Sequence, residues 1–422
     1  MVILLINIYK KYRALFLALA VVLIIILLTW MNFQYVKDNP GGYDFYTNWH
    51  ATRKFFFEDV NPYSEQNRLD VQNLVYGRTA LNGEEQYRFS IPLYGMLLYS
   101  PFALISNFIM ARALWMSFLE IALFAVLFLS IKLTWWKINR NLLIPLILFA
   151  FLGLHGIITL LNGGLIIPIT LITLLILYAI QNKQDEVAGL LLGLMTIFPI
   201  PVGLFGLLVL IRLIAIRRFK VIWWMLGCLG LLVGFSIALI PEWILQFLVN
   251  LINAFRELNP GSPGSVLISR WGAVGNRFSI IISVIVGLLL LFEWWHSVKA
   301  GEQHFLWAAF LTLALGTWSG IKVSPLDYVI LYPGLIMGFA LLYERWKNRS
   351  IGTILLILAL LFLSNWAIYL LTMSADFKPE ISSFLFIPLP LTVIVLLYWS
   401  KWWVKKSNSV ELEPTLIELK RP

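Results

Sequence analysis

A polar segment near the start of the chain carries the side chain best suited to chemistry. Residues 41–63 read GGYDFYTNWHATRKFFFEDVNPY. We expect a helix from Asp44 to about Phe57, because Asp44 suits an N-cap or first-turn position and Asn61-Pro62 ends the helix. A carboxylate at this position could act as a general base, which removes a proton from a reacting hydroxyl. An ordinary helix-capping role for Asp44 is the alternative.

The spacing along this helix separates two faces, because residues three and four positions apart are neighbours. One face is small and polar and comprises Asp44, Thr47, Asn48 and Ala51. The other is aromatic, suits the interface between lipid and water, and comprises Phe45, Trp49 and Phe56. Asn48 is therefore a candidate substrate-binding residue beside Asp44.

The composition of the chain places this segment in a membrane protein. Of the 422 residues, 60% are apolar and 13% are charged, and the mean hydropathy is +0.83. An ordinary soluble domain has roughly 25% charged residues, so this chain cannot cover a water-exposed surface. The net charge is 32 − 22 = +10. The basic residues lie in short clusters between apolar runs, as orientation signals do, and we expect no nucleic-acid binding.

We expect neither a cofactor nor a metal ion. Cys228 is the single cysteine and lies in an apolar run, which excludes a disulfide framework and cysteine-based metal sites. The sequence also lacks the spaced histidines and clustered carboxylates that hold metal ions.

The apolar runs predict an all-α polytopic membrane protein with about ten full spans, since one span needs about 20 apolar residues. The candidate spans are 14–33, 109–131, 141–161, 165–181, 219–240, 277–298, 304–321, 325–343, 351–371 and 383–404. Two further runs are interrupted by proline. We interpret 91–108 as a helix along the outer face. The run 187–213 is broken at 198–201, and we interpret it as a hairpin of two short helices. If both arms of the hairpin are included, the number of membrane helices is 12.

The positive-inside rule gives the orientation of these spans. It places both termini of a multi-pass cell-membrane protein in the cytoplasm. The hairpin interpretation of 187–213 also keeps four basic residues inside: Lys132, Lys137, Arg140 and Lys183. The predicted regions are an N-terminus and first span (1–33), a first outer loop (34–108), a bundle (109–240), a second outer loop (241–276), a second bundle (277–404) and a cytoplasmic tail (405–422).

Four collinear motifs give the chain a family resemblance. Asp44-Phe45-Tyr46-Thr47-Asn48-Trp49 with Asn61-Pro62-Tyr63 resembles the opening of family 87 glycosyltransferases. Phe89-Ser90-Ile91-Pro92-Leu93 with Leu97-Leu98-Tyr99-Ser100-Pro101 resembles the proline element of that family. Ala188-Gly189-Leu190-Leu191-Leu192-Gly193 and Ser324-Pro325-Leu326-Asp327-Tyr328 are similar to its later segments. The resemblance covers roughly residues 40–340.

The resemblance implies a GT-C-like fold and a transferase that uses a polyprenyl-phosphate-linked donor, as the polyprenol-phosphate-mannose-dependent mannosyltransferases do. It implies transfer of a hexose, such as mannose, to a lipid or glycan acceptor at the extracytoplasmic face, among membrane lipids. It assigns Asp44 as the general base of a single inverting displacement.

The departing phosphate of such a donor needs cations or backbone donors. The outer-face cations are Arg53, Lys54, Arg88, Arg270 and Lys322. Lys322 is the first choice and Arg270 the second, and Arg53 could instead bind lipid headgroups. Asp327, at the start of a span, is either a substrate-binding acid or a partner of the helix dipole. We expect His155 to be a buried imidazole bonded to a neighbouring helix.

Two other functions compete with the transferase. A transporter or flippase of lipid-linked sugars would have ionisable residues at mid-membrane and two related halves. A non-catalytic membrane scaffold would use its aromatic residues as interfacial anchors. Both leave the polar chemistry of the first outer loop unexplained.

Overall fold

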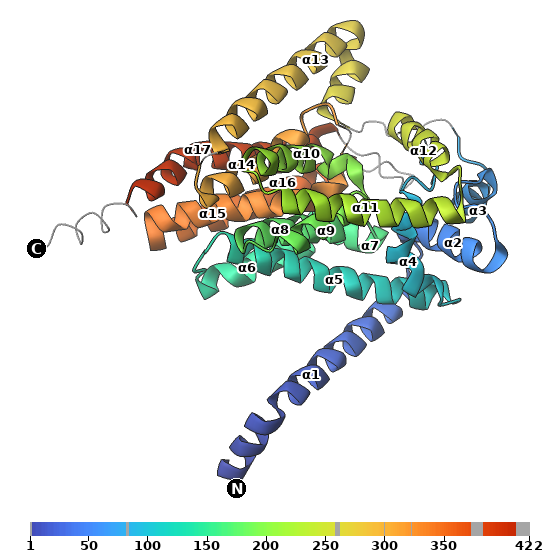
Figure 1. Cartoon of the computed structure of the whole chain (residues 1–422), viewed down its shortest axis with the longest axis horizontal. Helices are drawn as coiled ribbons and strands as arrows, with labels where there is room; N and C mark the ends of the chain where they lie inside the picture. Colours follow the sequence, from blue (N-terminus) through green and yellow to red (C-terminus); the bar gives the residue numbers. More distant parts are fainter. Residues whose placement is uncertain are drawn as a thin grey trace, which may run out of the picture.

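A computed structural model describes residues 2–81, 84–257, 262–298, 300–321, 323–372 and 383–410. Within those ranges the chain forms helices and connecting turns, with no strand. Figure 1 shows a bundle from which α1 and α13 project on different sides. The sequence-based expectation of an all-α membrane protein is therefore confirmed for the described residues.

The helices before the predicted hairpin are α1 (Val2–Asp38), α2 (Tyr43–Glu58), α3 (Glu65–Tyr76), η1 (Leu93–Gly95), α4 (Met96–Ala103), α5 (Phe108–Leu133), α6 (Arg140–Leu152), α7 (Leu154–Asn162) and α8 (Ile166–Gln181). The hairpin and second outer region contain α9 (Asp185–Met195), α10 (Pro199–Ala215), α11 (Phe219–Leu239), α12 (Trp243–Glu257) and α13 (Pro263–Ser297). The last helices are α14 (Glu302–Gly316), η2 (Pro325–Leu331), α15 (Tyr332–Trp346), η3 (Lys347–Arg349), α16 (Ser350–Thr372), η4 (Ser383–Phe386) and α17 (Pro388–Val410).

The expected count of ten full spans is not confirmed. Six described segments are long and apolar enough to cross a membrane: Ala18–Asp38, Phe108–Leu133, Phe219–Leu239, Pro263–Ser297, Pro325–Thr372 and Phe384–Val404. The expected span 165–181 forms α8 almost residue for residue, but this helix is too short for a full crossing. At 1.5 Å per residue, the 16 residues of α8 cover about 24 Å, less than the roughly 30 Å of a hydrocarbon core.

One expected span is broken near its middle. The run 141–161 forms α6 and α7, which meet at Gly153 with a bend of 46°. Gly153 has extended backbone between the two helices, and a Cβ atom there would lie 2.2 Å from the carbonyl oxygen of Phe149. Counting this bent pair as one span raises the total from six to seven.

The 187–213 run forms two helices, α9 and α10, separated before Pro199. Two ion pairs join the start of α9 to the turn after α10 and to the start of α11. Arg218 pairs with Asp185, and Lys220 pairs with Glu186 at 2.5 Å. These contacts bring the two ends of the segment together, as the hairpin interpretation requires.

The predicted outer regions gather at one end of the bundle, where Figure 1 places α2, α3, α4 and α12. The expected helix over 91–108 is much shorter, because α4 covers only Met96–Ala103. The second outer loop is mainly helical: α12 and the start of α13 occupy it, and α13 kinks at Gly272. Residues 258–261 of this loop lie outside the described residues.

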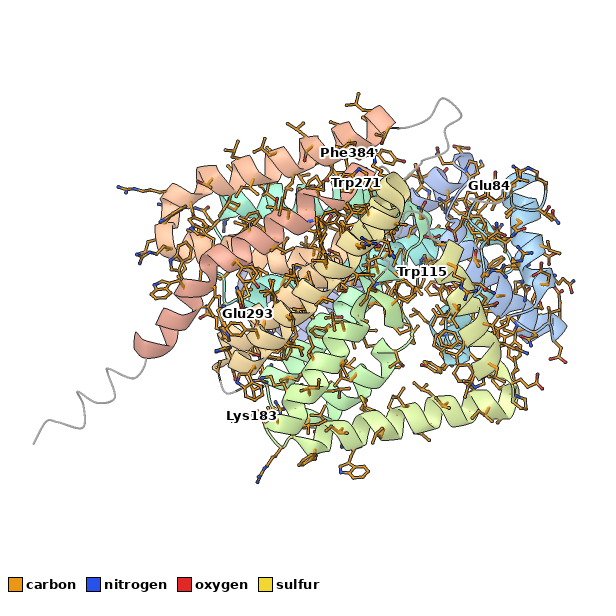
Figure 2. The ribbon with its side chains drawn as sticks, turned by 90° about the horizontal axis from the view of Figure 1, so that it is seen from above. Glu84, Trp115, Lys183, Trp271, Glu293 and Phe384 are labelled. Atoms are coloured by element: carbon orange, nitrogen blue, oxygen red, sulfur yellow. The ribbon has the colours of Figure 1, made fainter. Side chains whose placement is uncertain are left out.

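Polar contacts between helices stabilise the bundle and fix which helices pack together, which apolar side chains in a lipid environment do not. Asn32 of α1 donates its amide to Ser117 and Glu120 of α5, at 3.0 and 3.1 Å. Lys401 of α17 pairs with Glu293 of α13 at 2.5 Å. Figure 2 shows Glu293 and Lys183 toward the end of the bundle away from Glu84 of the first outer region.

Candidate active site

Asp44 lies in the first turn of α2 and is not the N-cap residue. Gly42 holds the N-cap position, with φ 74° and ψ 33°, and no side chain caps the helix there. The Asn48 amide donates to the backbone oxygen of Asp44 at 2.9 Å. The Asp44 side chain therefore does not cap α2, and its carboxylate is available for other chemistry.

Arg112 of α5 fixes the entry into α2. Its guanidinium donates to the carbonyl oxygen of Asn39 at 2.9 Å and to that of Leu161 at 3.1 Å. The glycine pair before Asp44 packs directly on this guanidinium, since a Cβ atom on Gly42 would lie 2.3 Å from Arg112 Nε. The Arg112 side chain is buried, and a buried charge must be paired or hydrogen-bonded to be tolerated. One arginine thus joins the ends of α1 and α7 to the start of α2.

An aromatic cluster holds the opposite face of α2. Phe45 is fully buried and stacks on Trp115 of α5 with ring centroids 5.2 Å apart. The Trp115 indole donates to the carbonyl oxygen of Gly163 at 3.0 Å. Gly163 has φ 77°, and a Cβ atom there would lie 2.5 Å from the Cβ of Phe45, so the turn after α7 touches α2.

The expectation that Phe45 and Trp49 face lipid is wrong. Trp49 is 5% exposed and donates its indole N–H to the carbonyl oxygen of Phe102 at 2.9 Å. Phe56, two residues before the end of α2, does remain 45% exposed. The first two rings are buried because α4 and α5 cover this face of α2.

The far end of the site is built by contacts between α7 and η2. The Thr159 hydroxyl donates to the carbonyl oxygen of Leu326 at 2.7 Å. Ser324 caps η2 by accepting from the Leu326 N–H at 3.2 Å. Asp327 therefore lies in the first turn of a short 3-10 helix, as the sequence predicted for a helix start.

His155 is buried, as expected from the sequence, with 1% of its surface exposed. Its imidazole approaches the Asn365 side chain of α16 and the backbone of Pro325, although neither ring nitrogen reaches full hydrogen-bond geometry with any of the described residues. The ring lies against Tyr328 of η2, with centroids 5.5 Å apart. Thr159, one turn further along α7, makes the hydrogen bond to η2.

The environment of Asp44 shifts the pKa of its carboxyl toward neutral pH. Burial, and to a smaller extent the negative charges of Glu85 and Asp327, raise this pKa to about 7. The side chain nevertheless remains exposed to solvent. The carboxyl is therefore reachable from solvent although protein surrounds it closely. A carboxyl with a pKa near 7 is about half deprotonated at neutral pH, the condition that favours proton transfer.

Asp44 and Asp327, remote in sequence, are thus brought within electrostatic range of each other. The model of glycosyltransferase family 87 matches residues 89–325, which is more than half of the 422-residue chain. The chain belongs to glycosyltransferase family 87. Its apolar helices and this membership identify a membrane glycosyltransferase. No curated protein and no solved structure matches it.

The match of this family 87 glycosyltransferase begins after α2 and α3 and ends at the start of η2. Asp44 lies before the matched residues and Asp327 after them, so membership does not test either assignment. Both remain predictions from the residues and from their geometry.

Asn48 joins the site next to a buried tyrosine. The Tyr99 hydroxyl of α4 is fully buried and has no hydrogen-bond partner among the described residues. Burial and the charge of Asp44 raise the pKa of the Tyr99 hydroxyl, and the nearby Asn48 amide lowers it by a smaller amount. The amide does not reach hydrogen-bond geometry with this hydroxyl. Asn48 and Tyr99 therefore flank the Asp44 carboxyl.

The cations proposed for the donor phosphate are dispersed. Arg53 donates to the carbonyl oxygen of Ala103 at 2.8 Å and so binds the end of α4. Arg88 is close enough to Glu65 for its charge to lower the pKa of that carboxyl. Arg270 is exposed, near the Phe384 ring. Lys322 lies outside the described residues.

Figure 2 shows Trp271, the neighbour of Arg270, well separated from Glu84 of the first outer region. The structure places Asn48 beside Asp44 on α2 and Asp327 within electrostatic range of Asp44, whereas Arg53 contacts α4, Arg88 lies near Glu65 and Arg270 lies near Phe384. Lys54, another outer cation, pairs with Asp70 at 2.6 Å.

Sequence reasoning missed several residues that surround Asp44 in this candidate site: Glu85, Tyr87, Tyr99 and Arg112. Arg112 had a usable sign, because an arginine just inside an apolar run is costly in a membrane and is usually functional. Glu85 and Tyr87 had none, since their approach to Asp44 depends on how residues 84–92 fold back on α3. Within the described ranges, no three histidine, cysteine or acidic side chains group to bind a metal ion.

Proposed function

We propose that this glycosyltransferase moves a hexose from a polyprenyl-phosphate-linked donor to a lipid or glycan acceptor at the extracytoplasmic face of the cell membrane. Both termini would then be cytoplasmic, as the basic clusters predict. The lipid tail of the donor would lie among the apolar helices, with the phosphate at the interface. Mannose is the hexose that the family resemblance favours.

Asp44 is the general base in this mechanism. It takes the proton of the acceptor hydroxyl while that oxygen attacks the anomeric carbon, and the polyprenyl phosphate departs from the opposite face. The new glycosidic bond therefore forms with inversion. The observation that carries the proposal is the reachable Asp44 carboxyl whose pKa is raised to about 7 by burial and by Glu85 and Asp327.

Asp327 and Asn48 contribute to substrate binding on either side of the base. Their approach from η2 and from the next turn of α2 supports hydrogen bonds to sugar hydroxyls. Lys322, which precedes η2 in the chain, and Arg270 are the proposed partners of the donor phosphate, where a cation stabilises the developing charge.

The test is sugar transfer by the full-length protein in liposomes, with a panel of polyprenyl-phosphate sugars and acceptors. Asp44→Asn removes the base and should lower turnover by about 10²-fold or more, while the fold persists because the side chains are nearly isosteric. Asp59→Asn is the matched control, since Asp59 is an exposed acid that ends the same helix. Near-normal turnover of Asp44→Asn would refute the assignment of the base, and Asp327 would be tested next.

A further inference from the structure

A group of tyrosine rings stands beside the first turn of α2 and has no part in the mechanism above. Tyr43 immediately precedes Asp44, and its ring meets that of Tyr87 edge to face, with centroids 6.0 Å apart. Tyr76, the last residue of α3, lies 5.9 Å from Tyr87. All three side chains are half-buried, so each keeps part of its surface open.

Tyr87 is held in a backbone conformation that bulky residues rarely adopt. Its φ is 51°, and such outliers persist only where the surrounding structure enforces them. The residues just before it are bound to α3. The Gln72 amide donates to the carbonyl oxygen of Gln86 at 2.9 Å, and the Tyr76 hydroxyl donates to that of Glu85 at 3.2 Å. These contacts therefore hold the Tyr87 ring at this position in spite of its unfavourable backbone conformation.

The chemistry around the rings is selective for one class of ligand. A sugar ring has an apolar C–H face that packs on an aromatic ring, and hydroxyls around its edge that donate hydrogen bonds. Asp44 and Glu85 supply carboxylate acceptors beside the tyrosines, close enough that the charge of Glu85 raises the pKa of Asp44. A phosphate or an acidic lipid headgroup would be repelled by the same carboxylates.

We propose that Tyr43 and Tyr87 form the surface that binds the sugar ring of the acceptor, so that the acceptor is a saccharide, either free or carried on a lipid. This inference rests on the proposed role of Asp44. The hydroxyl that Asp44 deprotonates belongs to the acceptor, and Tyr43 adjoins Asp44 in the first turn of α2. The acceptor ring must therefore lie beside these tyrosines.

The test measures binding without transfer, so that it stands apart from the proposed activity. Full-length protein in phosphatidylcholine nanodiscs, free of sugar-based detergent, is titrated with methyl glucoside, methyl mannoside and methyl galactoside. Glycerol serves as a polyol that is not a saccharide. Saturation-transfer NMR reports which protons of the probe touch the protein. At least one methyl glycoside should bind through the C–H protons of its ring, and glycerol should not.

Three variants locate the binding. Tyr87→Leu should weaken glycoside binding about fivefold, the effect of losing contact over about 40 Å² of apolar surface. Tyr87→Phe keeps the ring and should bind within about twofold of the native protein. Tyr87→Gly removes the ring and also relieves the backbone at this φ, so it should fold at least as well as the native chain and still bind weakly.

Phe56→Leu is the matched control, because Phe56 is an exposed aromatic side chain elsewhere on α2. Binding that survives in both Tyr87→Leu and Tyr87→Gly would overturn the proposal, as would failure of every glycoside to bind the native protein. Tighter binding of octyl than of methyl glycosides would identify a lipid-carried saccharide, and equal binding a free one. Glycoside binding that persists in a chain without transfer activity would contradict only the proposed function.

Discussion

Gly42→Ala is the substitution whose cost follows most directly from the geometry of the site. Gly42 has φ 74°, and an alanine in this left-handed region costs about 1–2 kcal/mol. The added Cβ would also lie 2.3 Å from Nε and 2.7 Å from Cδ of Arg112. Cδ belongs to the buried stem of the arginine and Nε to the guanidinium itself, so the guanidinium must move.

Movement of the guanidinium breaks at least one of its bonds, to Asn39 at 2.9 Å or to Leu161 at 3.1 Å. A hydrogen bond to a charged group contributes about 1.5–3 kcal/mol. The two effects together predict a loss of about 2.5–5 kcal/mol in the free energy of unfolding, a large part of the total stability of an ordinary domain. Turnover should fall as well, because the first turn of α2 carries Asp44.

Thermal and detergent-induced unfolding of the purified protein measures this loss. Gly77→Ala is the matched control. Gly77 also has a left-handed φ, 68°, but no atom lies within 4 Å of its Cβ position. Gly77→Ala should therefore lower the free energy of unfolding only by the cost of placing alanine in the left-handed region. In an Arg112→Ala background, which lacks both Cδ and Nε, the clash is relieved, and Gly42→Ala should cost about as little as Gly77→Ala. Equal costs of Gly42→Ala in the native and Arg112→Ala backgrounds would refute the proposed contact.

Three further experiments test other parts of the structure. The raised pKa of Asp44, about 7, predicts that kcat/KM rises with pH below about 7 as the carboxyl loses its proton and then levels off. Glu85→Gln removes a like charge and should lower that pKa, so a pH–rate profile that does not move to lower pH would contradict the proposed coupling. Lys401→Met leaves the buried carboxylate of Glu293 unpaired and should destabilise the protein by about 3–5 kcal/mol, whereas the double variant with Glu293→Gln should recover much of this loss in an unfolding assay. Arg270→Gln should raise the KM for the donor about tenfold if its side chain binds the phosphate, and an unchanged KM would move the phosphate site elsewhere.

The sequence was sufficient to predict the local structure around Asp44. The glycine pair, the first-turn acid and Asn61-Pro62 are signals that act within a few residues, and α2 begins and ends within one residue of the predicted limits. The break before Pro199 was predictable for the same reason, since proline interrupts a helix wherever it occurs in its interior.

The membrane spans and the burial of α2 were less accessible to sequence reasoning. An apolar run predicts a helix in the membrane but not whether that helix crosses it fully, so the 16-residue α8 resembles a full span in the sequence. Phe45 has the spacing of a lipid-facing residue, and its burial depends on Trp115 and Gly163 far along the chain. The grouping of Asp44 with Asp327 likewise requires the long-range packing of α7 against both α2 and η2.

The polar contact between α1 and α5 has a consequence for biosynthesis. Asn32 is made and inserted before its partners Ser117 and Glu120 exist, because the whole first outer region is translated between them. Until α5 arrives, the amide has no internal partner and must stay hydrated near the membrane surface, where its place close to the end of α1 keeps it. Docking of α5 then takes this group out of water, so the arrival of the second long helix is the step that commits α1 to its final depth in the bilayer.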